Sequence, residues 1–206
     1  MKKLTLLGVV TKLYPKHNSN RRALLTFILS TFCFLNSYAQ KSTTERLFVG
    51  DRIPDIQFDS VLNYSNGTAT ISQLQSQKSK LLLFDFWFTS CSSCIEQFPK
   101  LDSLQKKYED RLQIVLVAHE PSDKVIASIQ RWEKRFKRKL DLPIVVNDKV
   151  LHQYFPHKYE PHYLWIAPDR VCLAETAHYL VEESYIRTYL DKIPEDLKAR
   201  GFVTPQ

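Results

Sequence analysis

The sequence predicts an α/β fold, in which helices cover both faces of a central mixed β-sheet. Hydrophobic residues make up 44% of the 206 residues, which is enough to form the core of one globular domain. Two nearly continuous apolar runs, at 80–88 and 113–120, are typical of strands that are buried on both faces. Apolar residues at helical spacing follow each run, and this alternation of strand and helix patterns indicates a layered architecture.

Residues 1–39 are expected to be a signal peptide rather than part of the core. They carry six Lys and Arg residues and no acidic residue, followed by the apolar run ALLTFILSTFCFL and a small-residue end at Ala39. The apolar run is short for a membrane span, so we predict cleavage after Ala39, with a retained membrane anchor as the alternative. Phe32 is too bulky to precede a lipid-modified Cys33. Residues 40–206 then form a single domain in the periplasm or another extracytoplasmic compartment.

The apparent basicity of the chain comes mostly from this segment. The formal net charge is +7, but without the six cations of residues 1–39 the balance is 23 basic against 22 acidic residues. We therefore expect no nucleic-acid partner. The basic stretch 131–140 has Trp132 and Phe136 four residues apart, which favours a helix with one apolar stripe and a solvated basic face.

The elements of the domain can be assigned in chain order. Asn66-Gly67 separates two short alternating runs and predicts a β-hairpin or a pair of edge strands. The strand 80–88 leads into a helix at 92–111, and the strand 113–120 leads into a helix at 122–136, for which Ser122 or Asp123 is the expected cap. The later elements are a short strand or extended loop (142–148), a short helix (149–155), an antiparallel strand pair (162–168 and 171–179) and a closing amphipathic helix (182–193).

Two cysteines, Cys91 and Cys94, lie where the first buried strand gives way to a helix. The first N–H groups of a helix carry partial positive charge, so the pKa of the Cys91 thiol should fall below that of a free thiol. Cys94 should lie one turn later on the same face, which makes Cys91 an exposed attacking thiol and Cys94 a buried resolving thiol. A structural disulfide across two residues would add little stability. Cys172, in an alternating run, is expected to be a buried small hydrophobe.

Around this pair the sequence resembles the thioredoxin superfamily. Asp85-Phe86-Trp87 before Cys91 and Pro99 after Cys94 have the spacing of that signature. The segments CIEQFP and GDRIPDIQF (50–58) are similar to the exported TlpA/ResA-like branch of thiol:disulfide oxidoreductases, and the likeness extends over roughly residues 50–193. The resemblance implies a thioredoxin-like fold with an N-terminal β-hairpin extension.

The resemblance also implies a cis peptide bond before Pro161, facing the cysteine pair. Such a bond would expose the backbone of Glu160 beside Cys91, where an extended substrate could add hydrogen bonds. An ordinary trans turn proline is the alternative. Trp87, Pro161 and His162 are the expected substrate-binding residues.

Asp85 is the expected proton relay of the site. Its neighbours in sequence are apolar, so burial should raise its pKa and allow it to accept a proton from Cys94 near neutral pH. Glu160 is a second acid of this type with a less defined role. His162 stands where the family usually has Thr: a protonated imidazole there would stabilise the Cys91 thiolate and shift the pair toward an oxidant, unless it is only a surface histidine.

These residues predict an exported thiol:disulfide oxidoreductase, with reduction as the favoured direction. No cofactor other than the Cys91–Cys94 disulfide is expected, and no metal. The partners would be a disulfide-containing or dithiol client protein and an external membrane or periplasmic electron donor, with a possible membrane tether through the N-terminal segment. A thioredoxin-fold copper chaperone that also uses His162, and a redox-inert binding module, are the alternatives.

Overall fold

The computed structural model describes Phe27, residues 45–75 and residues 81–192. The chain divides into two units, 1–43 and 44–206, and the description below concerns the second. The predicted signal peptide, with its cleavage point and Cys33, lies outside the described residues apart from Phe27. Within the described part of the chain, no helix combines the length and the hydropathy that crossing a bilayer requires.

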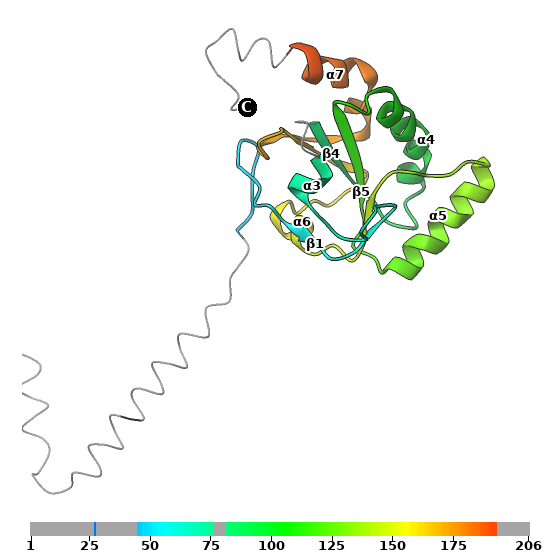
Figure 1. Cartoon of the computed structure of the whole chain (residues 1–206), viewed down its shortest axis with the longest axis horizontal. Coiled ribbons are helices and arrows are strands. Elements are labelled where there is room, and N and C mark those ends of the chain that lie inside the picture. The colour runs from blue at the N-terminus through cyan, green and yellow to red at the C-terminus, as the bar shows by residue number, and fades with distance from the viewer. Residues whose placement is uncertain (1–26, 28–44, 76–80, 193–206) are drawn as a thin grey trace, which may run out of the picture. The chain divides into compact units, whose positions relative to one another are not determined.

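A six-stranded mixed sheet forms the centre of the domain, with the strand order β2-β6-β5-β4-β7-β8. The central strands β4, β5 and β6 are parallel, whereas β7 is antiparallel to β4, β8 to β7 and β2 to β6. The strand bounds are Val61–Leu62 (β2), Leu81–Phe86 (β4), Leu112–Val117 (β5), Ile144–Val145 (β6), His162–Ile166 (β7) and Cys172–Ala177 (β8). The predicted mixed sheet and its antiparallel β7–β8 pair are confirmed (Figure 1).

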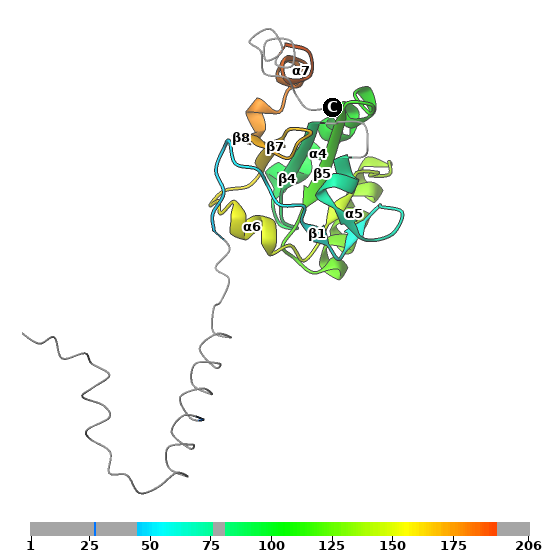
Figure 2. The same cartoon turned by 60° about the vertical axis from the view of Figure 1, so that its left-hand side comes forward.

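Helices cover both faces of this sheet, as predicted (Figure 2). Every residue of β4 is buried, and its side chains alternate between two hydrophobic clusters, with Leu83 in one and Phe84 in the other. The first cluster also contains side chains of α4 (Ser92–Lys107), α5 (Ser122–Phe136) and α7 (Glu183–Arg187). The second contains side chains of α3 (Ile71–Gln75) and α6 (Val150–Tyr154). Burial on both faces explains why the strand sequences read as continuous apolar runs.

The N-terminal extension is the predicted antiparallel pair, with one addition and one correction. β1 (Gln57–Phe58) pairs with β3 (Ala69–Thr70), and β2 between them joins the edge of the main sheet. The run after β3 does not continue as a strand, because Thr70 and Gln73 form a capping box. The Thr70 Oγ1 accepts from the Gln73 N–H at 3.2 Å, and the Gln73 Oε1 accepts from the Thr70 N–H at 2.8 Å, which starts helix α3.

The start of α5 differs from the prediction, and the closing helix has a mixed helix type. The residue that caps α5 is Pro121, without a side-chain hydrogen bond, rather than Ser122 or Asp123. Proline has its φ preset for this position, and Asp123 still lies in the first turn, where a negative charge favours the helix dipole. The predicted closing helix is present, but it changes type along its length: α7 (Glu183–Arg187) is followed directly by the π-helical segment η2 (Thr188–Lys192). The 3₁₀ turn η1 (His178–Leu180) precedes α7.

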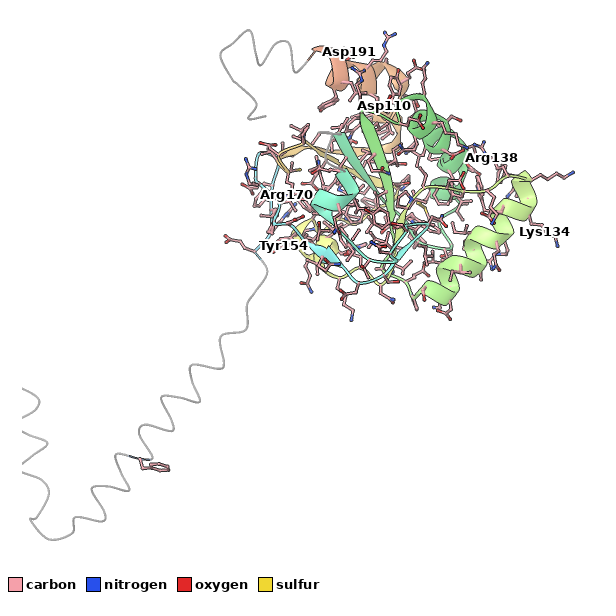
Figure 3. The ribbon with its side chains drawn as sticks, in the orientation of Figure 1. Asp110, Lys134, Arg138, Tyr154, Arg170 and Asp191 are labelled. Carbon is pink, nitrogen blue, oxygen red and sulfur yellow. A yellow bond between two sulfur atoms is a disulfide. The ribbon has the colours of Figure 1, made fainter. Side chains whose placement is uncertain are left out.

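The basic stretch at the end of α5 is largely a solvated helix face, as predicted. Lys134 lies on the outer side of α5, whereas Arg138 lies toward α4 (Figure 3) and pairs there with the buried carboxylate of Asp102. Trp132 is buried, but Phe136 is exposed, so the expected apolar stripe includes only the first of the two aromatic residues.

Candidate active site

The cysteine pair lies at the start of α4, just after the carboxyl end of β4. Cys91 is the N-cap residue of the helix, and its sulfur accepts a hydrogen bond from the Cys94 N–H at 3.2 Å. The two cysteines form a disulfide, with their Cα atoms 5.3 Å apart. This position places the Cys91 sulfur beside the partial positive charge of the helix N-terminus, as the sequence predicts.

Cys91 is less exposed than expected. Only 5% of its surface is accessible, and Cys94 has none. The order of exposure is the predicted one, but the description of Cys91 as an exposed thiol is wrong. The carbonyl oxygen of Glu160 lies 3.9 Å from its sulfur, and the Ser93 hydroxyl lies 3.4 Å from it.

The segment opposite the disulfide contains the predicted cis bond between Glu160 and Pro161. It precedes β7, which begins at His162 and pairs with β4. This arrangement brings the backbone of Glu160 to the cysteine pair, where the sequence predicts a substrate-binding position. Pro161 is buried.

A further contact holds the loop that leads to Cys91, and sequence reasoning missed it. The Glu120 carboxylate accepts from the backbone N–H of Thr89 at 2.5 Å and from its hydroxyl at 2.9 Å. Glu120 follows β5, so the ends of two neighbouring parallel strands are connected beside the disulfide. An acid three residues after a strand is not a recognisable signal without the topology.

Asp85 is fully buried, as predicted, in β4 opposite Tyr163 of β7. Burial raises its pKa well above the ordinary value, and the charge of Glu160 adds to this effect, while the Tyr163 hydroxyl and Lys100 oppose it. Tyr163 is near enough to influence the carboxylate, but neither Asp85 oxygen has a hydrogen-bond partner within bonding distance among the described residues. Asp85 is therefore a buried group that favours its protonated form.

Trp87 supports the site from within the core. Its side chain has no exposed surface and packs edge-to-face on Phe98 of α4, with ring centroids 5.0 Å apart. A direct contact between Trp87 and a substrate would require a rearrangement that exposes the ring. Cys172 is buried in β8 as expected, and burial raises the pKa of its thiol to about 11.

His162 is not a protonated imidazolium that could stabilise the Cys91 thiolate. Burial, together with the charge of His157, lowers its pKa to about 4, so it is neutral at pH 7. Its Nε2 lies 3.2 Å from the Glu175 Oε2 across the β7–β8 pair. Its side chain is 17% exposed, so it is not a surface histidine either.

The side-chain carboxylate of Glu160 lies beside two histidines, His157 and His152. Burial raises the pKa of this carboxyl group, but the neighbouring imidazoles of His152 and His157 outweigh that effect and lower it to about 2. Conversely, burial lowers the pKa of His152, but Asp148 and Glu160 outweigh it and raise it to about 9. The sequence predicted neither His152 nor His157 at the site, because they come from a helix and a loop with no shared motif.

No protein-family model matches the chain. The thioredoxin-like protein YneN of Bacillus subtilis is 32% identical over 81 residues, which cover 39% of this chain and 46% of the relative. The thiol-disulfide oxidoreductase YkuV of the same organism is 31% identical over 99 residues, which cover 48% of this chain and 66% of the relative. The matches thus span about half to slightly under two thirds of these relatives.

A solved structure shows the same fold. The thioredoxin domain of a thiol-disulfide oxidoreductase from Bacteroides vulgatus superposes with a TM-score of 0.55 at 20% identity, over 70% of this chain and 99% of that domain. Its layers agree with the mixed sheet and covering helices described above. The chain therefore has a thioredoxin-like fold with a CxxC disulfide at the start of α4, and its sequence is similar to a thioredoxin-like protein and a thiol-disulfide oxidoreductase.

Proposed function

We propose that this protein is an exported thiol:disulfide oxidoreductase of the TlpA/ResA-like branch, working through Cys91 and Cys94. The observation that carries the proposal is the position of the Cys91 sulfur, which caps α4 and lies 3.9 Å from the Glu160 carbonyl oxygen. Helix N–H groups stabilise a thiolate at this point, and the adjacent backbone offers an edge to an extended client segment. The names of the two sequence relatives, one of which is a thiol-disulfide oxidoreductase, agree with this chemistry.

The first step starts from the reduced protein. The Cys91 thiolate attacks one sulfur of a client disulfide, so that a Cys91–client S–S bond forms and the client S–S bond breaks. The second client sulfur leaves as a thiolate and takes a proton from water. The N–H of Cys94, which donates to the Cys91 sulfur in the oxidised form, stabilises the attacking charge before the reaction.

The second step releases the client. Asp85, in its carboxylate form, takes the proton of Cys94, and the resulting Cys94 thiolate attacks the Cys91 sulfur. The Cys91–Cys94 bond forms, the Cys91–client bond breaks, and the client sulfur leaves as a thiolate that takes the proton back from Asp85. The raised pKa of Asp85, caused first by burial, makes it a stronger base than an exposed carboxylate. The client has gained two electrons and the cysteine pair has lost two, so an external membrane or periplasmic dithiol donor must reduce the pair again.

Reduction of clients is the direction that we propose. A cation beside Cys91 would stabilise its thiolate and make the pair more oxidising. His162, the residue considered for this role, has a pKa lowered to about 4 by burial and by His157, and therefore supplies no such charge at pH 7. The expected signal peptide, cleaved or retained as a tether, would place the reaction outside the cytoplasm.

The test compares two cysteine variants in the reduction of insulin by dithiothreitol, with client trapping as a second readout. Cys91→Ser should abolish catalysed reduction, because the attacking sulfur is lost. Cys94→Ser should accumulate mixed disulfides, visible as client adducts on non-reducing gels, because the resolving sulfur is lost. Cys172→Ser is the matched control, and it should keep the activity of the unaltered protein because Cys172 is buried in β8.

Catalysed reduction by the Cys91→Ser protein would rule out the mechanism. Adducts formed equally by Cys91→Ser and Cys94→Ser would contradict the assignment of attacking and resolving roles. Inactivity of the unaltered protein toward both insulin and small disulfides would favour the redox-inert binding module. The copper chaperone has less support, because the Nε2 of His162 faces the Glu175 carboxylate at 3.2 Å.

A further inference from the structure

Four of the six histidines of the chain lie together in one group. His119 follows β5, His152 lies in α6, and His157 and His162 lie on either side of the Glu160–Pro161 bond. Their rings form a row, with successive centroid distances of 5.4, 5.3 and 4.4 Å. The redox mechanism above uses none of these imidazoles.

Three side chains of this region offer ligand atoms to one point. His119, His152 and Glu160 place one nitrogen or oxygen each so that all lie within 4.8 Å of one another. The Nε2 of His152 is 3.8 Å from the Oε1 of Glu160, which is too long for a hydrogen bond but short enough for both to contact a shared ion. The ligands come from three separate segments, so the sequence carries no metal-binding motif.

The orientation of the His152 ring is fixed by Asp148. Its Nδ1 is 2.7 Å from the Oδ2 of Asp148, which also accepts the backbone N–H of His152, while the other Asp148 oxygen accepts the N–H of Leu151. A carboxylate with these donors is an acceptor, so the Nδ1 of His152 carries a proton and the Nε2 points toward Glu160. Ligating histidines in metal sites are held in the same way, by a carboxylate on the second ring nitrogen.

The two carboxylate oxygens of Glu160 lie in different surroundings. The Nδ1 of His157 lies 2.9 Å from the carbonyl oxygen of Phe155, and its Nε2 lies 3.3 Å from the Oε1 of Glu160. The Oε2 of Glu160 is buried without a hydrogen-bond partner among the described residues, on a side chain that is 10% exposed.

We propose that His119, His152 and Glu160 bind a divalent transition-metal ion of the Zn²⁺ class. Two imidazoles and one carboxylate suit this class of ion, and three protein ligands leave a fourth position for water or an exchangeable group. A tetrahedral ion needs its ligand atoms about 3.4 Å apart, so the 3.8 Å pair has to close only slightly. His119 is exposed, so it can adjust to the ion and provides the route by which the ion arrives.

The test is a Zn²⁺ titration of the full chain, made without a histidine tag and competed against a chromophoric chelator. The Cys91–Cys94 pair is kept oxidised so that its thiolates cannot bind the metal, and a Cys33→Ser background removes the thiol outside the described residues. We expect one ion per chain. Co²⁺ provides an independent probe, because its visible absorption reports the ligand geometry directly.

Three variants locate the site. His119→Gln and Glu160→Gln should each weaken Zn²⁺ binding by about 100-fold, the upper range for altered metal surroundings, and should remove the Co²⁺ spectrum. His178→Gln is the matched control, since His178 is also an exposed histidine but lies in η1, outside the group. It should bind Zn²⁺ as the unaltered protein does. Far-UV circular dichroism verifies that each variant is folded.

The proposal is overturned if the oxidised protein binds no Zn²⁺, or if His119→Gln binds it with unchanged affinity. His119→Gln is the decisive variant, because an exposed side chain can be replaced without disturbing the core. Because the titration uses the oxidised protein, its outcome leaves the oxidoreductase proposal untouched.

Discussion

Asp85 is the residue at which stability and activity oppose each other most directly. It has no exposed surface, and its oxygens have no hydrogen-bond partner within the described part of the chain. Ionising such a group is unfavourable, because the protein replaces none of the water that a carboxylate loses on burial. The same environment makes the carboxylate a useful base. We therefore expect its replacement to stabilise the fold and to slow the second step.

Asp85→Asn keeps the shape of the side chain and removes its charge. The folded-state pKa of Asp85 is raised above the ordinary value of 3.8, so its contribution to stability is fully present below that pH and is lost as the pH rises through the folded-state pKa. At pH 7 the variant should gain about 1–3 kcal/mol in urea unfolding of the oxidised protein. This gain should shrink toward pH 4. Resolution of the mixed disulfide should slow by about 100-fold.

Asp102 provides the comparison for this prediction. It is as buried as Asp85 but pairs with Lys106 and Arg138. Asp102→Asn should therefore destabilise the protein, because two cations lose their partner. A loss of stability in both variants would show that Asp85 stabilises the fold through its charge, contrary to the expectation.

Sequence reasoning identified residues of the site whose signal is local. Cys91, Cys94 and Asp85 lie within ten positions, at the end of one strand and the start of one helix. The resemblance added Pro161 and its cis bond. His119 and His152 could not be predicted in the same way, because only the pairing of strands and the placement of α6 bring them together. The charge state of His162 could not be predicted from the sequence either, because its pKa depends on how deeply the side chain is buried.

The N-terminal extension is held to the rest of the domain by Asn63, the residue after β2. Its backbone has a positive φ of 56°, and its side-chain amide donates to the carbonyl oxygens of Leu140 and Leu142 at 2.8 and 3.0 Å. These carbonyls lie just before β6, the neighbour of β2 in the sheet. One side chain therefore joins the extension to the strand with which it pairs.

Two substitutions at Asn63 separate the backbone conformation from the hydrogen bonds. Asn63→Ala loses both bonds and places a Cβ-bearing residue without a local partner at positive φ, so we expect a loss of about 2–3 kcal/mol. Asn63→Gly relieves the backbone and should lose about 1 kcal/mol less than Asn63→Ala. Urea unfolding measures both. Asn66→Ala, in the same exposed turn region, is the control and should change stability little.

An equal loss for Asn63→Ala and Asn63→Gly would mean that the positive φ contributes nothing. Hydrogen-exchange protection of the Val61 amide, which donates to the Gly67 carbonyl, gives a second readout. Its protection should fall in both variants and remain in Asn66→Ala.

Long elements with a strong period were predicted more fully than short ones, although the short helix α6 also lies within its expected bounds. β4, β5, α4 and α5 appear near their expected bounds because continuous apolar runs and helical spacing each span many residues. β2 and β6 have two residues each, which is too few to show a period, and they are strands because β2 pairs with β6 and β6 also pairs with β5. The start of α3 was readable in principle from Thr70 and Gln73, but the alternating run around them favoured a strand.

Across the whole domain, the reactive groups meet at one edge of the sheet. The loop with Cys91 follows β4, and His119 and Glu120 follow its parallel neighbour β5. Carboxyl ends of adjacent parallel strands lie side by side, and this edge is where α/β proteins usually place their sites. The antiparallel strand β7 enters from the opposite direction and brings Glu160 and Pro161 to the same edge.

The direction of electron flow depends on the whole molecule, and the redox potential of the Cys91–Cys94 pair measures it. The potential of the pair reflects which redox state the fold stabilises, since the oxidised and reduced proteins unfold to chains that differ only in the disulfide. For the proposed reductase we expect a potential at or below about −250 mV, and a higher stability of the oxidised form. Alkylation and mass shift in graded thiol buffers give the potential, and urea unfolding gives the stabilities.

A potential near about −120 mV, with the reduced form more stable, would make the protein an oxidant and contradict the proposed direction. The Cys91→Ser, Cys94→Ser double variant is the control. Its unfolding should not depend on the thiol buffer, which shows that the effect arises from this pair and not from Cys172.

The small accessible area of Cys91 limits which disulfides the protein can reduce. Secreted and periplasmic proteins commonly depend on structural disulfides. For the exported reductase that we propose, indiscriminate reduction would therefore unfold the proteins around it. A sulfur with 5% of its residue's surface exposed, lying against the Glu160 carbonyl, is reached by a protruding, extended segment and not by a disulfide set in a rigid surface. We expect the site to select client disulfides by their shape. Disulfides in misfolded or extended segments should react, and disulfides within folded domains should not.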